Sequence, residues 1–73
     1  MSATGFGKLI WAYKRHLDAA ALAAEPLEEF ERLYKLGNSS AEADVAVLED
    51  ARHELVKLQR GDAENLSIWK HIN

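Results

Sequence analysis

The chain has 73 residues, no cysteine and a formal net charge of −3 at neutral pH. This length allows one small domain, whose core rarely supplies more than about 3–5 kcal/mol of stability without a disulfide, a metal or a partner chain. The absence of cysteine excludes disulfides and thiolate zinc sites. No apolar run reaches the roughly 20 residues of a membrane span, and the first residues lack the pattern of a secretory signal, so we expect no membrane association and a cytoplasmic location.

The charge balance argues against nucleic acid as a partner. The chain has twelve acidic and nine basic side chains, and an acidic surplus disfavours unaided binding to a polyanion. Small basic clusters occur beside Trp11 and around Arg60, but neither offsets that surplus.

The first helix is expected over about residues 8–18, because Leu9, Ile10, Tyr13 and Leu17 recur at helical spacing. Lys14 and Arg15 would then face water. The alanine-rich stretch over residues 18–24 either extends this helix or forms a weak connector, and we favour a break near Asp18.

A second helix is expected over about residues 26–36. Pro26 suits the first helical position, and Glu28 and Glu29 suit the positive end of the helix dipole. One face carries Leu27, Phe30, Leu33 and Tyr34. Gly37 is the predicted C-terminal cap, and residues 37–40 are the predicted turn.

Third and fourth helices are expected over about residues 44–60 and 63–72. Ser39-x-x-Glu42 has the spacing of a capping box, and Asp44 is a rival N-cap. Gly61 ends the third helix and Asp62 caps the fourth. Because no segment alternates as a strand does, we predict an all-α fold, a small antiparallel bundle of three to four amphipathic helices in a single domain.

No catalytic, cofactor-binding or metal-binding residue is predicted. No two of His16, His53 and His71 lie three or four residues apart, so no helix offers a histidine pair to a metal. The acidic runs fit solvated helix faces better than paired catalytic carboxylates, since Glu28 with Arg32 and Glu31 with Lys35 have favourable i,i+4 spacing.

Three stretches resemble one part of the arginyl-tRNA synthetase family. They are Thr4-Gly5-Phe6-Gly7-Lys8-Leu9-Ile10, then Lys57-Leu58-Gln59-Arg60-Gly61-Asp62, then Ile68-Trp69-Lys70. In that family a Gly-Asp-Trp-Gly-Thr-Gln-Phe-Gly segment leads into a long helix, a variable acidic helix follows, and a later helix ends in Lys-Leu-Gln-x-Gly-Asp shortly before Leu-Trp. The order and spacing agree across almost the whole chain.

The resemblance implies a helical segment of a catalytic domain, with clear departures from the family pattern. Ser2 and Ala3 stand where the family has Trp-Gly, and Gly5 stands where it has Gln. The family's His-Ile-Gly-His and Lys-Met-Ser-Lys-type motifs have no counterpart here, so no catalytic role is carried over to any position.

The sequence therefore leaves two main hypotheses of function. In the first, the chain is a non-catalytic helical module that oligomerises, most simply as a homodimer, because large apolar side chains lie on at least three helices. The second makes it an accessory piece that contacts tRNA or a synthetase. An independent enzyme is a third and weaker hypothesis. The candidates for core or interface contacts are Trp11, Tyr13, Phe30, Leu55 and Trp69.

Overall fold

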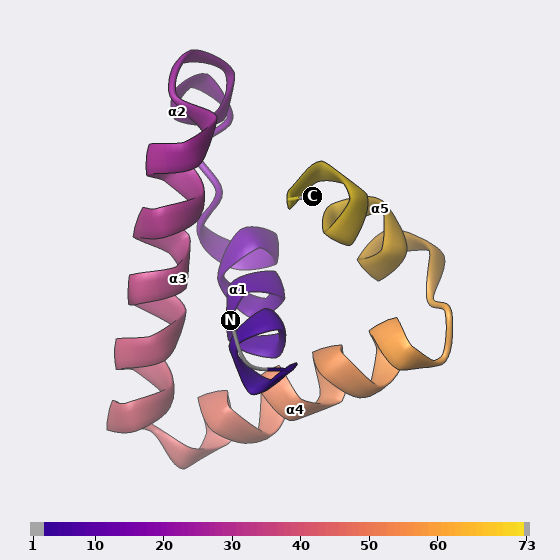
Figure 1. Cartoon of the computed structure of the whole chain (residues 1–73). Coiled ribbons are helices and arrows are strands. Elements are labelled where there is room, and N and C mark those ends of the chain that lie inside the picture. The colour runs from indigo at the N-terminus through magenta and orange to yellow at the C-terminus, as the bar shows by residue number, and fades with distance from the viewer. Residues whose placement is uncertain (1–2, 73) are drawn as a thin grey trace.

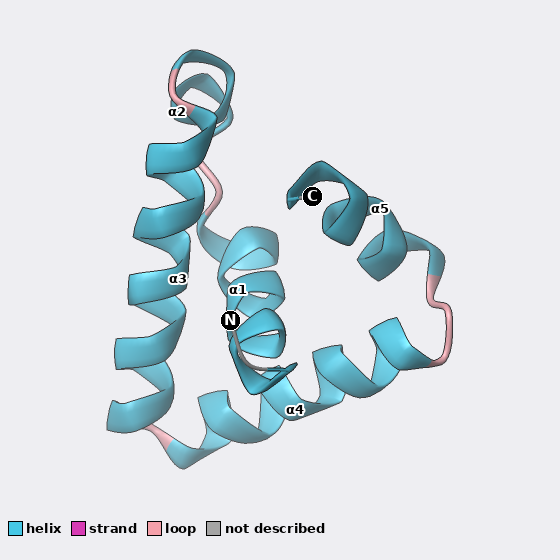
Figure 2. Cartoon of the chain, viewed as in Figure 1, coloured by secondary structure: helices cyan, strands magenta, loops and turns pink. Residues whose placement is uncertain are grey.

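The computed structural model describes residues 3–72, and within this range all regular structure is helical (Figures 1 and 2). The helices are α1 (Ala3–His16), α2 (Ala19–Ala24), α3 (Pro26–Ala43), α4 (Val45–Gln59) and α5 (Ala63–Ile72). The predicted all-α class is confirmed, but the described residues form five helices, and the packing is not a simple antiparallel bundle. Figure 1 shows α1 alongside α3, while α4 crosses the end of both and α5 turns back toward the centre.

Helix α1 is the centre of the fold. Its four consecutive residues Leu9, Ile10, Trp11 and Ala12 are all buried, with exposed fractions between 0% and 7%. Four neighbours in a row cover a complete helical turn, so this middle turn of α1 is enclosed on all sides, whereas Arg15 and His16 at the end of the helix are exposed. Leu33 from α3 and Ala51 from α4 complete the buried cluster around it.

Two glycines lie inside helices although the sequence analysis leaves Gly7 outside the first helix and makes Gly37 a cap. Gly7 belongs to α1, which starts at Ala3 rather than near residue 8 and ends at His16, earlier than predicted. Gly37 lies in the middle of α3, which runs on to Ala43, so the predicted cap and turn at residues 37–40 are wrong. Both glycines are buried where two helix backbones meet, Gly7 against Ala51 and Gly37 against the carbonyl of Lys8.

Aspartates lie at three of the breaks between helices. Asp18 caps α2 through a 3.0 Å hydrogen bond from the Ala21 N–H, which confirms the break near Asp18. Asp44, not the Ser39 capping box, caps α4 through the Ala46 N–H at 2.9 Å. Asp62 accepts from the Asn65 N–H at 3.1 Å, and Gly61 has φ of +85°, as predicted for the left-handed residue after a helix.

The chain closes its own core to the usual extent for its mass. Its accessible surface is 4533 Å², against about 4,500 Å² expected for a compact monomer of this size. Its radius of gyration is 11.4 Å, against about 11 Å expected. The amount of exposed surface is therefore ordinary for this mass. The surface is characterised instead by the side chains that remain exposed on it.

Candidate functional site

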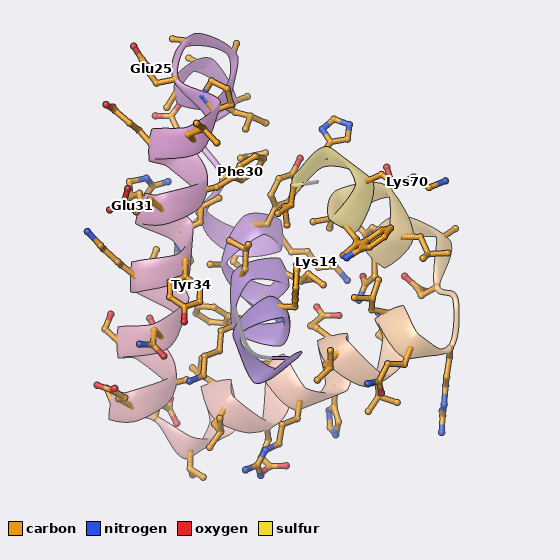
Figure 3. All side chains as sticks on the ribbon, in the orientation of Figure 1. Lys14, Glu25, Phe30, Glu31, Tyr34 and Lys70 are labelled. Atoms are coloured by element: carbon orange, nitrogen blue, oxygen red, sulfur yellow. The ribbon has the colours of Figure 1, made fainter. Side chains whose placement is uncertain are left out.

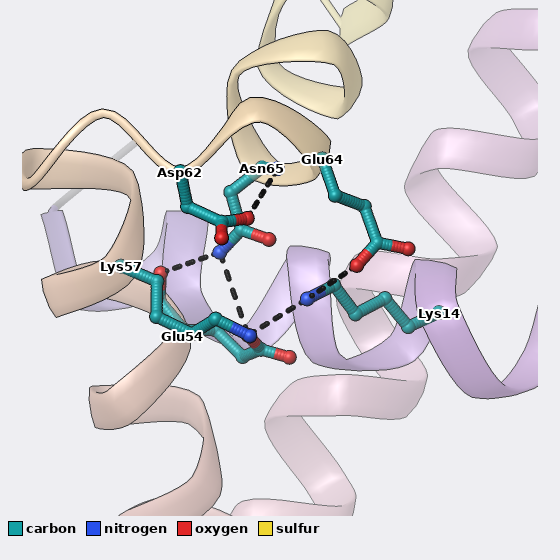
Figure 4. A network of polar contacts seen from close by, with 6 residues as sticks. All are labelled: Lys14, Glu54, Lys57, Asp62, Glu64 and Asn65. Carbon is teal, nitrogen blue, oxygen red and sulfur yellow. Dashed lines mark hydrogen bonds and ion pairs between the residues drawn. The ribbon is translucent and has the colours of Figure 1, made fainter.

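A partly buried ionic cluster joins α1, α4 and α5 (Figure 4). The Glu54 carboxylate on α4 accepts a 2.9 Å hydrogen bond from the Lys14 ammonium on α1. Lys14 also pairs with Glu64 on α5 at 3.2 Å, and Lys57 lies 3.7 Å from the Glu54 carboxylate. The side chains of Lys14 and Glu54 are only 15% and 9% exposed, so the prediction that Lys14 faces water is wrong.

The electrostatics of this cluster hold Lys14 and Glu54 in their charged forms. Burial alone would lower the pKa of Lys14, but its hydrogen bonds to Glu54 and Glu64 raise that pKa above its ordinary value. Burial would raise the pKa of Glu54, but hydrogen bonds from Lys14 and Asn65 hold it below its usual range. A general acid or base needs a pKa near the working pH, so these directions favour a structural role.

Asn65 secures α5 to this cluster and is completely buried. Its Nδ2 donates a 2.8 Å hydrogen bond to the Glu54 backbone carbonyl, while its Oδ1 is buried with no hydrogen-bond partner within the described residues. Sequence reasoning missed Asn65 and Glu54. The available signal was that Asn65 recurs at helical spacing with Ile68 and Ile72 and so shares a face with them.

A second buried carboxylate fixes the junction between α1 and α2. Both oxygens of Glu29 accept 2.7 Å hydrogen bonds from Arg32, and the Asp18 N–H donates to the same carboxylate at 2.8 Å. The Arg32 guanidinium also donates to the His16 carbonyl at 2.8 Å. The hydrogen bonds from Arg32, and then from Asp18, lower the pKa of Glu29 to about 2.

This junction corrects one sequence prediction. The sequence places Glu29 in a solvated first turn, yet the residue is only 2% exposed. Arg32 bonds with Glu29 at i,i+3 and not with Glu28 as the i,i+4 spacing predicts. The other predicted pair, Glu31 with Lys35, is confirmed at 3.0 Å.

The predicted interface candidates lie in different environments. Trp11 is buried, with its Nε1 unpartnered within the described residues and the Arg15 guanidinium 5.2 Å from the ring centroid. Tyr13, Phe30 and Leu55 are half-buried, and Trp69 is 39% exposed. They do not form one site. His16, His53 and His71 are exposed, and residues 3–72 contain no group of three or more His, Asp or Glu placed for a metal.

An apolar groove opens between α3 and the end of α5. It encloses about 310 Å³ and is lined by Leu9, Leu27, Phe30, Glu31, Tyr34 and Ile72. Leu27 is 81% exposed at its rim. Figure 3 shows Phe30 and Tyr34 on this side of α3, with Glu31 pointing away from the core. This groove, which sequence reasoning did not predict as a unit, is the apolar surface that a partner could cover.

A second depression, of about 580 Å³, lies between α1 and α5. It is lined by Tyr13, Lys14, Arg15, Glu64, Ser67 and His71, together with Leu17 and Ile68. Its Lys14 and Glu64 pair with each other at 3.2 Å. Arg15, whose guanidinium lies 5.2 Å from the Trp11 ring centroid, is a further cation at this depression.

The fold and the contacts described above define a small unit of helices packed around α1. The family model described as the catalytic domain of class I tRNA synthetases (R) matches residues 2–73, and the chain belongs to this family. Curated relatives are arginine–tRNA ligases from Lactococcus lactis, 43% identical over 65 residues, and from Fusobacterium nucleatum, 43% identical over 69 residues. A third, from Streptococcus pyogenes, is 45% identical over 65 residues.

These matches confirm the resemblance found in the sequence and set its extent. They cover 89% to 94% of this chain but only 12% of each relative. No solved structure gives a significant match. No helix within the described residues is long and apolar enough to cross a membrane.

Proposed function

We propose that this chain is a helical interaction module that performs no aminoacylation by itself and associates with a second copy. The observation that carries the proposal is the apolar groove between α3 and α5, with Leu27 81% exposed at its rim. Exposed apolar patches rimmed by polar residues mark interaction sites, and a two-fold pair is the commonest way in which identical chains cover one.

The non-catalytic part of the proposal is supported by the chemistry of the buried groups. The pKa of Lys14 is raised, and the pKa values of Glu29 and Glu54 are lowered. Each shift moves the group away from neutral pH, whereas proton transfer requires a shift toward it. These groups instead hold the helices in register.

A second candidate function is docking on a synthetase, and the family relationship favours it. The matched relatives are arginine–tRNA ligases, and the chain spans about one eighth of their length. Direct contact with tRNA has less support, because five of the nine basic side chains form ion pairs with carboxylates: Lys14, Arg32, Lys35, Arg52 and Lys57.

Two measurements on the pure chain test the proposal. We expect no arginine-dependent exchange of pyrophosphate into ATP, with a full-length arginine–tRNA ligase as the positive control. Exchange that persists after removal of contaminating synthetase would contradict the non-catalytic role. We also expect no saturable change in the anisotropy of labelled tRNA at physiological salt, and saturable binding would favour the accessory role instead.

A further inference from the structure

We infer that α5 is a hinged lid, which opens as a unit about residues 60–62 while α1, α3 and α4 stay folded. The side chains of Lys14, Glu54 and Asn65 form the latch that holds this lid closed. Opening requires no second copy of the chain, whereas its effect on the groove between α3 and α5 rests on the proposed function.

The core of the described residues does not depend on α5. Helices α3 and α4 both pack on α1 more extensively than α5 does, with close backbone contacts at Gly37 and Gly7. From α5, Ile72 packs against the edge of the core while remaining half-buried. Separation of α5 would therefore leave the central buried apolar cluster in place, because its side chains come from α1, α3 and α4: Leu9, Trp11, Ala12, Leu33 and Ala51.

Polar contacts supply much of the attachment of α5. Of its ten residues, Asn65 and Ile68 are buried. The Asn65 Nδ2 donates a 2.8 Å hydrogen bond to the Glu54 backbone carbonyl, and Glu64 pairs with Lys14 at 3.2 Å (Figure 4). Hydrogen bonds weaken steeply when they are stretched or misaligned, so a small displacement of α5 releases these contacts together.

The buried amide of Asn65 lowers the free-energy cost of opening. Its Oδ1 is buried with no hydrogen-bond partner within the described residues. A buried acceptor without a partner destabilises the closed form, because it has lost its hydrogen bond to water. On opening, this oxygen and the charged groups of Lys14 and Glu64 return to water, which offsets part of the lost contacts.

The hinge is the three-residue segment between the end of α4 at Gln59 and the start of α5 at Ala63. Gly61 at its centre has φ of +85° and open space within 4 Å of the position that a β-carbon would occupy. A glycine in open space can change its backbone angles without a side-chain clash. Hinges are commonly a few residues of this kind at the ends of secondary-structure elements.

Opening of α5 changes both of the surface hollows described above. Ile72 lines the apolar groove together with Leu9, and Ile68 lines the depression between α1 and α5 together with Tyr13 and Leu17. Each hollow loses one wall when α5 departs. A partner that binds the groove therefore binds only the closed form, and its binding would shift the population toward closure.

The lid differs from a helix that frays at its last turn. A helix as short as α5 is only marginally stable in water without tertiary contacts. Once undocked, α5 should lose its helical hydrogen bonds in one step along its whole length. Fraying would instead release them one after another from residue 72 backward.

Amide hydrogen exchange resolved by NMR tests the lid on the unmodified chain. We expect the amides of residues 66–72 to share one degree of protection, at least about tenfold below that of residues 9–12, and to respond less to urea, because local opening exposes less surface than global unfolding does. Protection and urea dependence equal to those of α1 would overturn the lid. Protection that declines residue by residue toward residue 72 would also overturn it.

Two alanine variants on α5 test the latch. Asn65→Ala should raise the exchange rates of the α5 amides by about tenfold, because it removes the hydrogen bonds from Asn65 to Glu54. Ser67→Ala, at an exposed position of the same helix, is the matched control and accounts for the higher helix propensity of alanine. Equal effects of the two variants would contradict the latch.

A core variant separates opening of the lid from global unfolding. Leu33→Val shortens a fully buried side chain of α3 that stays buried whether α5 is closed or open. It should therefore raise the exchange rates of the α1 amides by about fivefold and leave those of α5 unchanged. A parallel rise in α5 would show that α5 opens only when the whole chain unfolds.

The same exchange experiment across a range of protein concentrations separates the lid from the proposed function. If copies associate through the groove, exchange of the α5 amides should slow as the dimer forms. A dimer whose formation leaves this exchange unchanged would overturn the link between lid and groove. A chain that is monomeric at all concentrations, yet opens at α5, would overturn the proposed self-association and leave the lid intact.

Discussion

Gly7 on α1 lies so close to Ala51 on α4 that a β-carbon on residue 7 would overlap the Ala51 carbonyl oxygen. Gly37 has the same relation to the carbonyl of Lys8. Helix α1 therefore meets α4 and α3 by direct backbone contact on two sides. This close approach helps to enclose the middle turn of α1, residues 9–12.

The first prediction concerns this contact. Gly7→Ala should destabilise the fold by about 1–3 kcal/mol, as overpacking does, because the added methyl meets backbone that cannot rotate away. At an ordinary helical position the same change would stabilise, since alanine is the better helix former by up to about 1 kcal/mol. Urea unfolding followed by circular dichroism measures the difference, and a stabilised variant would contradict the close packing.

The second prediction concerns Gly61, which has φ of +85° and open space within 4 Å of the position that a β-carbon would occupy. Gly61→Val should cost roughly 1 kcal/mol or more through backbone strain alone. Gly61→Asn is the matched control, because asparagine tolerates the left-handed region and should cost less. Equal thermal midpoints for the wild type and the valine variant would show that this cap is unimportant.

The third prediction concerns the ion pair between Lys14 and Glu54. Lys14→Met should destabilise by about 2–4 kcal/mol, since it leaves Glu54 buried with weaker compensation. Adding Glu54→Gln to Lys14→Met should recover part of that loss. A double-mutant cycle gives the coupling, and strictly additive single effects would mean that the two groups are not coupled.

The fourth prediction is a dependence of stability on acid pH. The pKa of Glu29 is lowered from 4.5 to about 2 by hydrogen bonds from Arg32 and Asp18. Its ionised form therefore stabilises the fold above pH 4.5, and this contribution disappears as the pH falls from 4.5 toward 2. Thermal midpoints between about pH 6 and pH 2 should fall more steeply for the wild type than for Glu29→Gln. Parallel curves would contradict this assignment.

Some signals in the sequence can be interpreted from the residues next to them, and others cannot. The side chains of Asp18 and Asp44 accept hydrogen bonds from backbone N–H groups two or three residues further on, and Gly61 acts through its own left-handed backbone. Local chemistry could therefore indicate breaks at these positions. Gly7 and Gly37 could not be interpreted in this way. A glycine needed for close helix contact has the same local signature as one needed for a turn, and only the tertiary partner distinguishes them.

The burial of charged residues could also not be predicted from the neighbouring sequence alone. Glu29 and Glu54 are acidic residues on helices, and such residues are usually exposed. Their burial depends on contacts with Asp18, Lys14 and Asn65, each of which lies on another part of the chain. The sequence could predict helix α5 and its cap, but not that Asn65 would complete a cluster reaching α1 through Glu54.

The measurement that tests self-association most directly is the solution mass of the pure chain from micromolar to several hundred micromolar concentration. Sedimentation equilibrium should show a mass that rises from 8.2 kDa toward twice that value, with a thermal midpoint that rises in parallel. A constant mass of 8.2 kDa and a concentration-independent midpoint would contradict the proposal. The groove between α3 and α5 would then not be a surface through which this chain recognises its own copy.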